Sequence, residues 1–230
     1  TTLGDASERL RFLDGLDRRR CIKSHTPMDG LLYAKEPTYL VVYRHPIDMH
    51  FSFRTHSQSI SADILQFMFP DDERAGFQRF VTAPATDMGC DDLTLASLAR
   101  HYDEARAREK NGNVHFFHYA DLTRDLRGQI DRLCRILGTD LPADTRDAIA
   151  EANTFAAMRK VAEEAGKSGS AAKSLFARPE DFFASGTSNK WEGRLTAEDL
   201  EGYSERLADL FSPADRDWFE WGGVGRPAAS

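Results

Sequence analysis

The chain contains few cysteines, and their arrangement argues against two classes of protein. Cys21, Cys90 and Cys134 are widely spaced and odd in number. Disulfide-stabilised secreted domains depend on dense, paired cysteines, and structural zinc sites need cysteines in closely spaced pairs. We therefore expect reduced thiols and a cytoplasmic location.

Long apolar runs and an excess of positive charge are absent as well. No apolar stretch approaches the roughly 18 residues that a membrane-spanning helix needs, so we expect no membrane span. Lysine and arginine together number 30 against 37 aspartates and glutamates, which gives a formal net charge of −7. This balance argues against a general nucleic-acid binder, whose affinity requires an excess of positive charge. An anionic ligand must then be held by a local cluster of cations.

The composition that remains is typical of a soluble globular protein. The chain has 230 residues, of which 41% are hydrophobic and 29% are charged, and it shows no internal repeat. This length suits one large domain, so we expect residues 1–230 to form a single domain.

Three apolar runs of strand length alternate with helical patterns. The runs are 21–25 (CIKSH), 38–43 (TYLVVY) and 114–119 (VHFFHY), and helices are expected over 7–17, 93–109, 121–137 and about 197–211. The nearly continuous hydrophobicity of residues 38–43 is typical of a parallel strand covered on both faces. The alternation predicts an α/β fold with a central parallel sheet flanked by helices.

Lys23 and His25 stand two positions apart where the first predicted strand ends. In a strand, this spacing points both side chains to the same face. A cation beside a proton acceptor suits a site that handles a proton next to negative charge. The alternative is that His25 is only a satisfied polar residue at a strand end.

The segment YLVVYRHPIDMHFSF places an arginine directly after a buried strand and then opens a helix. Ligands of open parallel sheets bind beyond the carboxyl ends of the strands, and a helix N-terminus there offers N–H groups to an anion. Arg44 would add a planar, charged fork suited to phosphate, and Ser52 in the second helical turn would add a hydroxyl. Alternatively, Arg44 pairs with Asp48 and Ser52 packs against a neighbour.

Several segments occur in the order found in cytosolic-type sulfotransferases: IKSHTP, YLVVYRHPIDMHFSF, FFHYADL, NTFAAM and FFASGTSNKW. The chain resembles this superfamily from about residue 18 to about residue 211, and its bacterial, actinobacterial-looking members that sulfate glycolipids or small hydroxyl compounds resemble it most. The resemblance implies a P-loop-NTPase-like α/β fold. It also implies the cofactor 3′-phosphoadenosine 5′-phosphosulfate (PAPS), with the product 3′-phosphoadenosine 5′-phosphate (PAP).

The resemblance also implies the roles of individual residues. His25 is similar to the base that takes the proton of the acceptor hydroxyl, and Lys23 to the lysine near the transferred sulfuryl group. Arg44 and Ser52 resemble the pair that binds the 3′-phosphate. The remaining cofactor-binding residues are Tyr119, Asn153, Thr154 and Phe155 around the adenine, and Ser185 and Gly186 at the 3′-phosphate, with Trp191 matching a tryptophan shortly after.

Sulfuryl transfer resembles phosphoryl transfer, in which the attacking and leaving oxygens lie in line and positioned cations stabilise the charge. A hydroxyl becomes a good nucleophile when a neutral histidine takes its proton, and the charge of Lys23 is expected to keep His25 neutral. No metal is expected.

The acceptor is expected to be a hydroxyl of a small molecule or glycolipid, and four phenylalanines suit either its pocket or the core: Phe67, Phe69, Phe77 and Phe80. His45, His50 and His56 are expected at the surface or at the edge of the site. The oligomeric state stays open, with a homodimer as one option.

Two departures from the family pattern keep other functions open. The glycine-rich phosphosulfate loop is absent, and we expect it to precede Thr1 together with a first strand. In the predicted mobile lid, residues 163–190, Ala184-Ser185-Gly186 stands where relatives commonly have Arg-Lys-Gly. A non-catalytic PAP-binding module is therefore the first alternative. A small-molecule kinase is a second, although it would need a Walker-type loop and magnesium.

Overall fold

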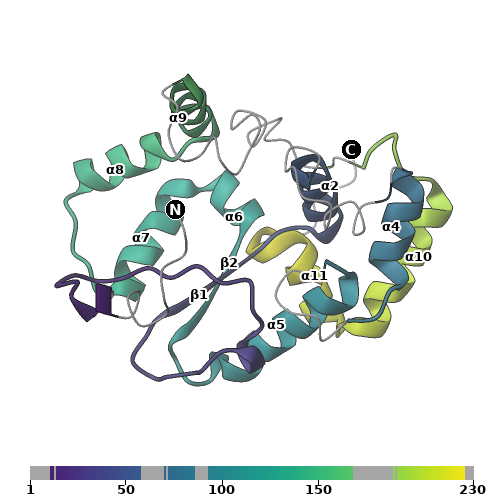
Figure 1. Ribbon diagram of the computed structural model, residues 1–230, viewed down its shortest axis with the longest axis horizontal. Coiled ribbons are helices and arrows are strands. Elements are labelled where there is room, and N and C mark those ends of the chain that lie inside the picture. Colours follow the sequence, from purple (N-terminus) through teal and green to yellow (C-terminus); the bar gives the residue numbers. More distant parts are fainter. Residues whose placement is uncertain are drawn as a thin grey trace.

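The computed structural model describes residues 11–12, 14–57, 70, 72–85, 93–167, 189 and 191–225. Its elements follow in the order η1 (Met28–Gly30), β1 (Tyr39–Tyr43), α2 (Pro46–Ser57), α4 (Glu73–Thr82), α5 (Leu95–Glu109), β2 (Val114–His118), α6 (Tyr119–Arg124), α7 (Leu126–Leu137), α8 (Ala143–Ala152), α9 (Phe155–Lys167), α10 (Ala197–Leu210), α11 (Pro213–Trp221) and η4 (Gly222–Val224). Figure 1 shows α5 on one side of the two strands and α7 on the other.

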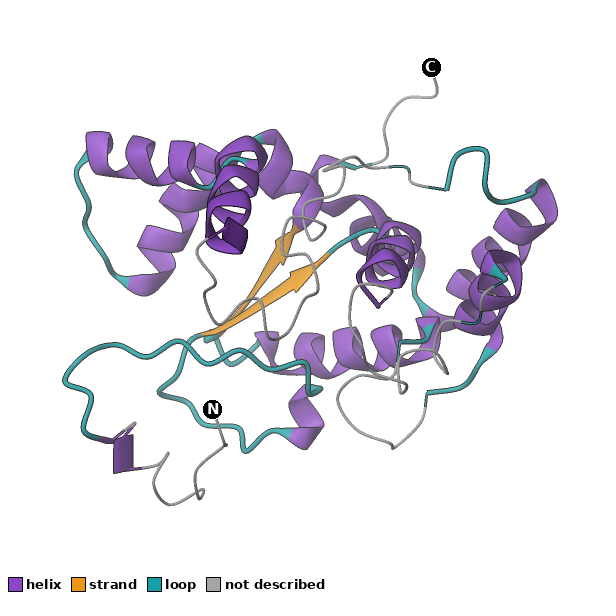
Figure 2. Cartoon of the chain, turned by 45° about the horizontal axis from the view of Figure 1, so that its top comes forward, coloured by secondary structure: helices purple, strands orange, loops and turns teal. Residues whose placement is uncertain are grey.

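Strands β1 and β2 pair in parallel and form the centre of the fold. Their register aligns Tyr39 with Val114 at one end and Tyr43 with His118 at the other, so both strands end at the same edge (Figure 2). The chain between them passes through α2, α4 and α5, as a parallel connection requires. The predicted α/β class and the strands predicted over 38–43 and 114–119 are confirmed.

The strand predicted over residues 21–25 is wrong. These residues are not paired with either strand. Cys21 and Ile22 are the apolar members of the segment, and both are exposed, so burial does not favour adding it to the sheet. The Ser24 hydroxyl accepts a hydrogen bond from the Thr26 N–H (3.0 Å), which turns the chain just before Pro27.

Side chains tie the segment around residues 21–25 to helices on both sides of it. Before it, the Arg19 guanidinium donates to the Leu137 carbonyl at the end of α7 (2.9 Å). After it, Met28 is buried in the core and Asp29 forms an ion pair with Arg100 of α5 (2.7 Å). The segment is therefore positioned by the two helices that flank the sheet.

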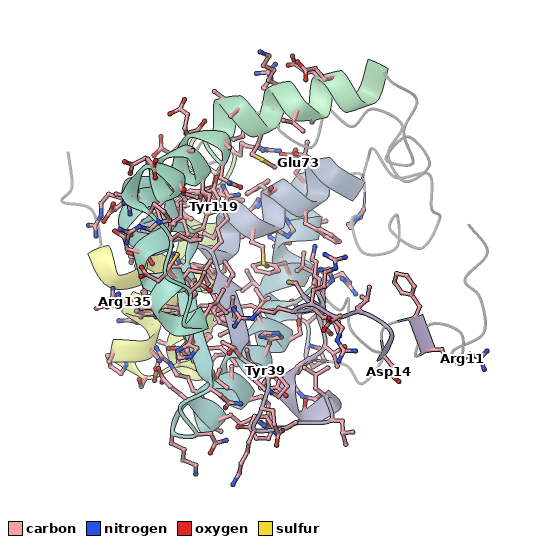
Figure 3. All side chains as sticks on the ribbon, turned by 90° about the vertical axis from the view of Figure 1, so that its left-hand side faces the viewer. Arg11, Asp14, Tyr39, Glu73, Tyr119 and Arg135 are labelled. Carbon is pink, nitrogen blue, oxygen red and sulfur yellow. The ribbon has the colours of Figure 1, made fainter. Side chains whose placement is uncertain are left out.

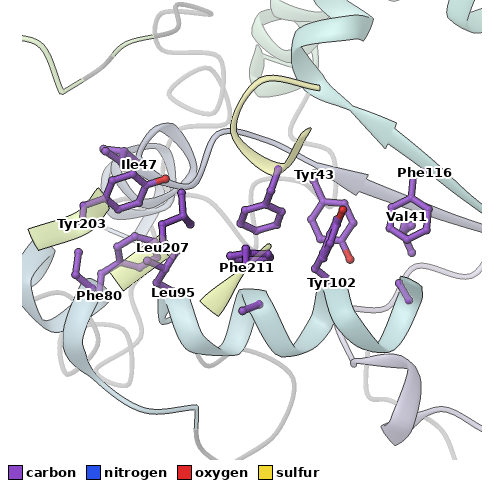
Figure 4. Close-up of a cluster of buried hydrophobic side chains, with 14 of the residues drawn as sticks. Val41, Tyr43, Ile47, Phe80, Leu95, Tyr102, Phe116, Tyr203, Leu207 and Phe211 are labelled. Carbon is purple, nitrogen blue, oxygen red and sulfur yellow. The ribbon is translucent and has the colours of Figure 1, made fainter. Parts of the chain in front are cut away.

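The core lies between the sheet and helices α4, α5, α10 and α11. Val41 and Tyr43 of β1 and Val114 and Phe116 of β2 face the same side, because parallel partners share a face and every second residue points the same way. Rings from four helices and from the residue that follows α10 belong to the same core cluster, as Figure 4 shows in part: Phe80, Tyr102, Tyr203, Phe211 and Phe219. The sequence left open whether four phenylalanines line an acceptor pocket or belong to the core. Phe77 and Phe80 are buried core residues. Phe67 and Phe69 lie outside the described residues.

The opposite face of the sheet is only partly covered. The Arg132 guanidinium of α7 lies 4.2 Å from the centroid of the Phe117 ring. On β1, Leu40 is 41% exposed and Val42 is 61% exposed. The prediction of a strand buried on both faces therefore holds for only one face of β1.

Local signals explain most helix boundaries. Helices α5 and α10 match the predictions over 93–109 and 197–211, and each begins with a capping box, formed by Thr94 with Ser97 and by Thr196 with Asp199. The single helix predicted over 121–137 is wrong, because the chain breaks into α6 and α7. The break lies at Asp125 (φ −141°, ψ 67°), whose carboxylate accepts a hydrogen bond from the N–H of the third residue of α7. Of the helix predicted over 7–17, residues 11, 12 and 14 are helical.

Candidate active site

The edge at which both strands end brings two predicted cofactor residues together. Because Tyr43 is aligned with His118, the next residues, Arg44 and Tyr119, leave the sheet side by side. The guanidinium carbon of Arg44 lies 4.3 Å from the centroid of the Tyr119 ring. This is a cation–π distance. In Figure 3, Tyr119 and Tyr39 mark the two opposite ends of the sheet.

The Arg44 side chain also interacts with the first turn of α2. Its Nη2 atom lies 3.9 Å from Oδ2 of Asp48, and the side chains of Arg44 and Asp48 are 19% and 4% exposed. The same carboxylate oxygen accepts a hydrogen bond from the backbone N–H of Asn189 (3.2 Å). The pairing of Arg44 with Asp48, left open by the sequence, is therefore present, and Arg44 still keeps part of its surface accessible at the strand edge.

Helix α2 begins at this edge, as predicted. Pro46 occupies its first position, which suits a residue without an N–H group, and the His45 carbonyl accepts the first helical hydrogen bond from Met49 (3.0 Å). Ser52 lies half-buried in the second turn. The positive end of the helix dipole and the Arg44 guanidinium thus occupy the same edge of the sheet.

His45 is enclosed by aromatic rings next to Arg44. It is 6% exposed, stacks on Trp191 with ring centroids 4.4 Å apart, and meets the Trp221 ring edge-on at 4.7 Å. Burial lowers the pKa of His45 to about 3, so this ring is neutral. His50 is also buried, at 1% exposure. It therefore does not lie at the surface, which was one of the two positions predicted for it.

His118 joins the end of β2 to the C-terminal helices. Its Nδ1 atom accepts a hydrogen bond from the Ala120 N–H (3.2 Å) and caps α6, and its Nε2 atom lies 3.2 Å from the Phe219 carbonyl. An accepting Nδ1 and a donating Nε2 define one neutral tautomer, and burial lowers the pKa of this ring. Gly222 approaches so closely that a Cβ atom there would lie 2.9 Å from the His118 Cβ. This junction holds Tyr119 in place at the strand edge.

Lys23 and His25 are exposed and lie in the unpaired segment before η1. Burial first, and then the charge of His25, lower the pKa of His101 of α5. His101 in turn lies 2.7 Å, through Nδ1, from the Tyr43 hydroxyl. Since Tyr43 directly precedes Arg44, this chain of contacts links the segment of His25 to the same strand end.

Tyr43 and His101 were not among the residues predicted for the site. Tyr43 reads in the sequence as the last apolar residue of a strand, and His101 as a polar residue beside the helical stripe of Leu95, Leu98 and Tyr102. Periodicity could have placed His101 at the border of the buried helix face. Its partner on β1 depends on how α5 packs across the sheet.

The predicted adenine-binding segment forms the joint between α8 and α9. The Asn153 side chain donates to the Ile149 carbonyl (2.8 Å), and the Thr154 hydroxyl accepts from the Ala157 N–H (3.3 Å) at the start of α9. Phe155 is 38% exposed. Ser185 and Gly186, predicted at the 3′-phosphate, lie outside the described residues, as does most of the predicted lid; residues 163–167 belong to α9.

The family model of the sulfotransferase domain matches residues 4–212 of this chain. The chain belongs to the sulfotransferase domain family. This sulfotransferase is 27% identical to a glycolipid sulfotransferase of Mycobacterium bovis over 98% of this chain and 76% of the relative. The resemblance seen in the sequence motifs is therefore confirmed, and the protein is an enzyme, a sulfotransferase similar to bacterial members of the family.

Solved structures support the fold of this sulfotransferase. A crystal structure of mouse sulfotransferase SULT7A1 complexed with PAP superposes with a TM-score of 0.70 at 18% identity, covering 90% of this chain and 71% of the mouse chain. Retinol dehydratase, in complex with androsterone and inactive cofactor PAP, superposes with a TM-score of 0.68 at 19% identity, covering 88% of this chain and 57% of that chain. At these identities the comparison concerns the fold alone.

The described residues contain neither a candidate membrane-spanning helix nor a candidate metal site. Among these residues, no helix combines the length and the apolar character needed to cross a membrane. Within the same part of the chain, no three histidine, cysteine, aspartate or glutamate side chains gather closely enough to hold a metal ion.

Proposed function

We propose that this sulfotransferase moves a sulfuryl group from PAPS to a hydroxyl of a glycolipid or small apolar acceptor, with His25 as the general base. The observation that carries the proposal is the position of Arg44 over the Tyr119 ring at the edge where both strands end and α2 begins. This edge is where parallel α/β sheets bind their ligands.

The side chains at the strand edge suit the cofactor. The Arg44 guanidinium is a permanent planar cation, which matches a phosphate, and the adjacent α2 N-terminus offers further N–H donors. Ser52 on the same helix would add a hydroxyl to the 3′-phosphate. The Tyr119 ring, with Phe155 from the α8–α9 joint, would offer aromatic surface to the adenine. When bound, PAPS would supply the activated sulfuryl group.

His25 and Lys23 would act on the acceptor side of the site. His25 is exposed, so an acceptor hydroxyl can reach its ring and pass its proton to a ring nitrogen. General-base assistance of this kind contributes about 10²–10⁴-fold to a rate. The ammonium group of Lys23 would stabilise negative charge on the transferred sulfonate oxygens.

The acceptor class rests on the relatives. The Mycobacterium bovis relative is a glycolipid sulfotransferase. A sugar hydroxyl is a poor nucleophile until its proton is removed, which fits a site built around a histidine base. We therefore place a glycolipid hydroxyl ahead of a small phenol or alcohol as the acceptor.

The test uses the full-length protein and separates binding from transfer. PAP and ATP are titrated by calorimetry, and transfer of labelled sulfate from PAPS is measured on a panel of glycolipids and small alcohols. We expect PAP to bind and ATP not to bind. His25→Ala should lower turnover at least 100-fold and leave the PAP affinity within about threefold of wild type, because His25 acts on the acceptor.

The matched control is His115→Ala, which removes a half-buried histidine from the second position of β2, opposite Leu40. It should keep turnover close to wild type. Turnover of His25→Ala at the wild-type level would reject the assigned base. PAP binding without any transfer would favour the non-catalytic PAP-binding module, and ATP-dependent phosphorylation would favour the kinase.

A further inference from the structure

The buried Tyr43 contacts a half-buried histidine, His101, on the helix to which the segment of His25 is anchored. The Tyr43 hydroxyl lies 2.7 Å from Nδ1 of His101 and 3.2 Å from the His101 backbone carbonyl. Tyr43 is 7% exposed, reaches from the end of β1 toward α5 (Figure 4), and its ring packs edge-on against that of His101. The contact of the Tyr43 hydroxyl with Nδ1 and the edge-on packing of the two rings hold the His101 ring in one orientation.

The segment that carries His25 is anchored at the neighbouring residue of α5. Asp29 binds Arg100 through two guanidinium nitrogens, at 2.7 and 3.2 Å, and Met28 is 3% exposed in the core. Arg100 directly precedes His101. His25 stands four residues before Asp29, so the anchor holds its segment against the turn of α5 that carries His101.

The two contacts of the Tyr43 hydroxyl also select a tautomer of His101. The hydroxyl can donate its proton to the His101 carbonyl and accept a hydrogen bond from Nδ1–H. The other ring nitrogen, Nε2, then carries a lone pair. Burial is the main reason why the pKa of His101 is lowered, so the ring stays neutral beside a second histidine.

We propose that His101, oriented by Tyr43, is a positioning residue for His25. Once His25 has taken the proton of the acceptor hydroxyl, its imidazole donates a hydrogen bond to Nε2 of His101. This inference rests on the proposed function, because it assigns a partner to the proposed base. The acceptor oxygen would use the electron pair of its O–H bond for the new O–S bond, while the bond between the sulfur and the 5′-phosphate oxygen of PAPS would break and PAP would leave with that electron pair. The proton passes to His25, which is exposed and can return it to solvent.

Several charged groups face this pair and belong in the interpretation of any pH profile. Asp29 from the η1 segment acts on His101, and Arg106 and Asp103 of α5 act on Tyr43. Burial also raises the pKa of Tyr43, so its hydroxyl stays protonated across the working range. The fall in turnover toward acid pH should therefore reflect the protonation of the proposed base, His25, together with its partner, His101.

The experiment compares the pH dependence of turnover in the full-length wild type and three variants. His101→Ala removes the acceptor nitrogen, and a hydrogen bond to a charged group contributes about 1.5 kcal/mol. This corresponds to a shift of about one pH unit, so the acid limb should move to lower pH and the plateau should fall about three- to tenfold. His101→Gln keeps an amide oxygen near the position of Nε2 and should recover most of both effects. Tyr43→Phe should shift the limb in the same direction, but less.

PAP affinity and thermal midpoint are measured for each variant, so that loss of folding is recognised separately. An acid limb that stays in place in the folded His101→Ala variant would overturn the inference, whether or not turnover falls. A shift that His101→Gln does not reverse would also contradict it. If the His25→Ala variant keeps full turnover, the proposed function fails first, and that outcome is distinct from either result for His101.

Discussion

The Arg44 guanidinium carbon lies 4.3 Å from the centroid of the Tyr119 ring, although the two residues follow different strands. The parallel register, which aligns Tyr43 with His118, produces this contact. Asp48 holds the same guanidinium from the first turn of α2. Three elements that meet at one edge of the sheet therefore determine where the cation points.

Removing the Arg44 guanidinium should weaken cofactor binding strongly. A charged hydrogen bond contributes about 1.5–3 kcal/mol, so Arg44→Ala should raise the Kd for PAP about 10- to 150-fold. Arg44→Lys keeps the charge but lacks the planar fork, so its Kd for PAP should lie between those of wild type and Arg44→Ala. The control is Arg127→Ala, which breaks an ion pair with Asp147 that joins α7 to α8. Calorimetry with PAP gives each Kd, and equal values for wild type and Arg44→Ala would refute the assignment.

The Tyr119 ring should matter more than its hydroxyl. Tyr119→Phe keeps the surface over which Arg44 lies and should bind PAP within about twofold of wild type. Tyr119→Leu removes the aromatic ring, and a cation–π contact contributes about 0.5–2 kcal/mol, so the Kd should rise about 2- to 30-fold. Competition binding with a fluorescent PAP analogue can resolve this range. Equal loss in both variants would instead point to the hydroxyl as the essential group.

The protein should lose stability as the pH falls below about 6.5. Burial lowers the pKa of His45 to about 3 and that of His50 to about 4, and it lowers those of His101 and His118 as well. Between these values and 6.5, the unfolded chain binds protons that the folded chain does not. The free energy of unfolding therefore decreases toward acid, by up to about 1.4 kcal/mol per pH unit for each histidine.

His50→Leu should isolate one of these contributions. Urea unfolding between pH 7 and pH 4.5 should show a dependence on pH that is flatter by up to about 1.4 kcal/mol per unit. The control is Phe80→Leu, because its ring lies 4.9 Å from that of His50 and it does not titrate. Phe80→Leu should lower the free energy of unfolding equally at every pH. An unchanged slope in His50→Leu would show that His50 binds its proton as readily in the folded state as in the unfolded state.

Gly222 should not tolerate a side chain. Its φ is +70°, and a Cβ atom there would lie 2.8 Å from Oδ2 of Asp121 and 2.9 Å from His118. Left-handed strain and overpacking together cost about 2–4 kcal/mol, so Gly222→Ala should lower the thermal midpoint by several degrees. Gly202→Ala is the matched control, since it lies within α10 with nothing within 4 Å and should stabilise the helix by up to about 1 kcal/mol. Calorimetric scans of both variants provide the comparison, and a neutral Gly222→Ala would mean that η4 can move away from β2.

Local sequence signals predicted most of the elements that carry the site. The run at 38–43, the arginine after it and the helix opening at Pro46 are all where the sequence places them. The strand prediction over residues 21–25 was wrong. The segment has an apolar, β-favouring residue in Ile22, but this side chain is 75% exposed and so gains nothing from joining the sheet. Strand formation depends on a partner and a covered face more than on intrinsic propensity.

The sequence by itself determined helices α5 and α10 with their caps, the positions of the two strands and the motif order that indicates a sulfotransferase, because each depends on residues close together in the chain. Only the tertiary structure decided that Arg44 meets Tyr119, that Tyr43 binds His101, and that Asp29 and Arg100 hold the segment of His25 against α5. These contacts join residues far apart in the chain. Their geometry follows from strand register and helix packing, which depend on the burial of the whole apolar face and not on any single segment.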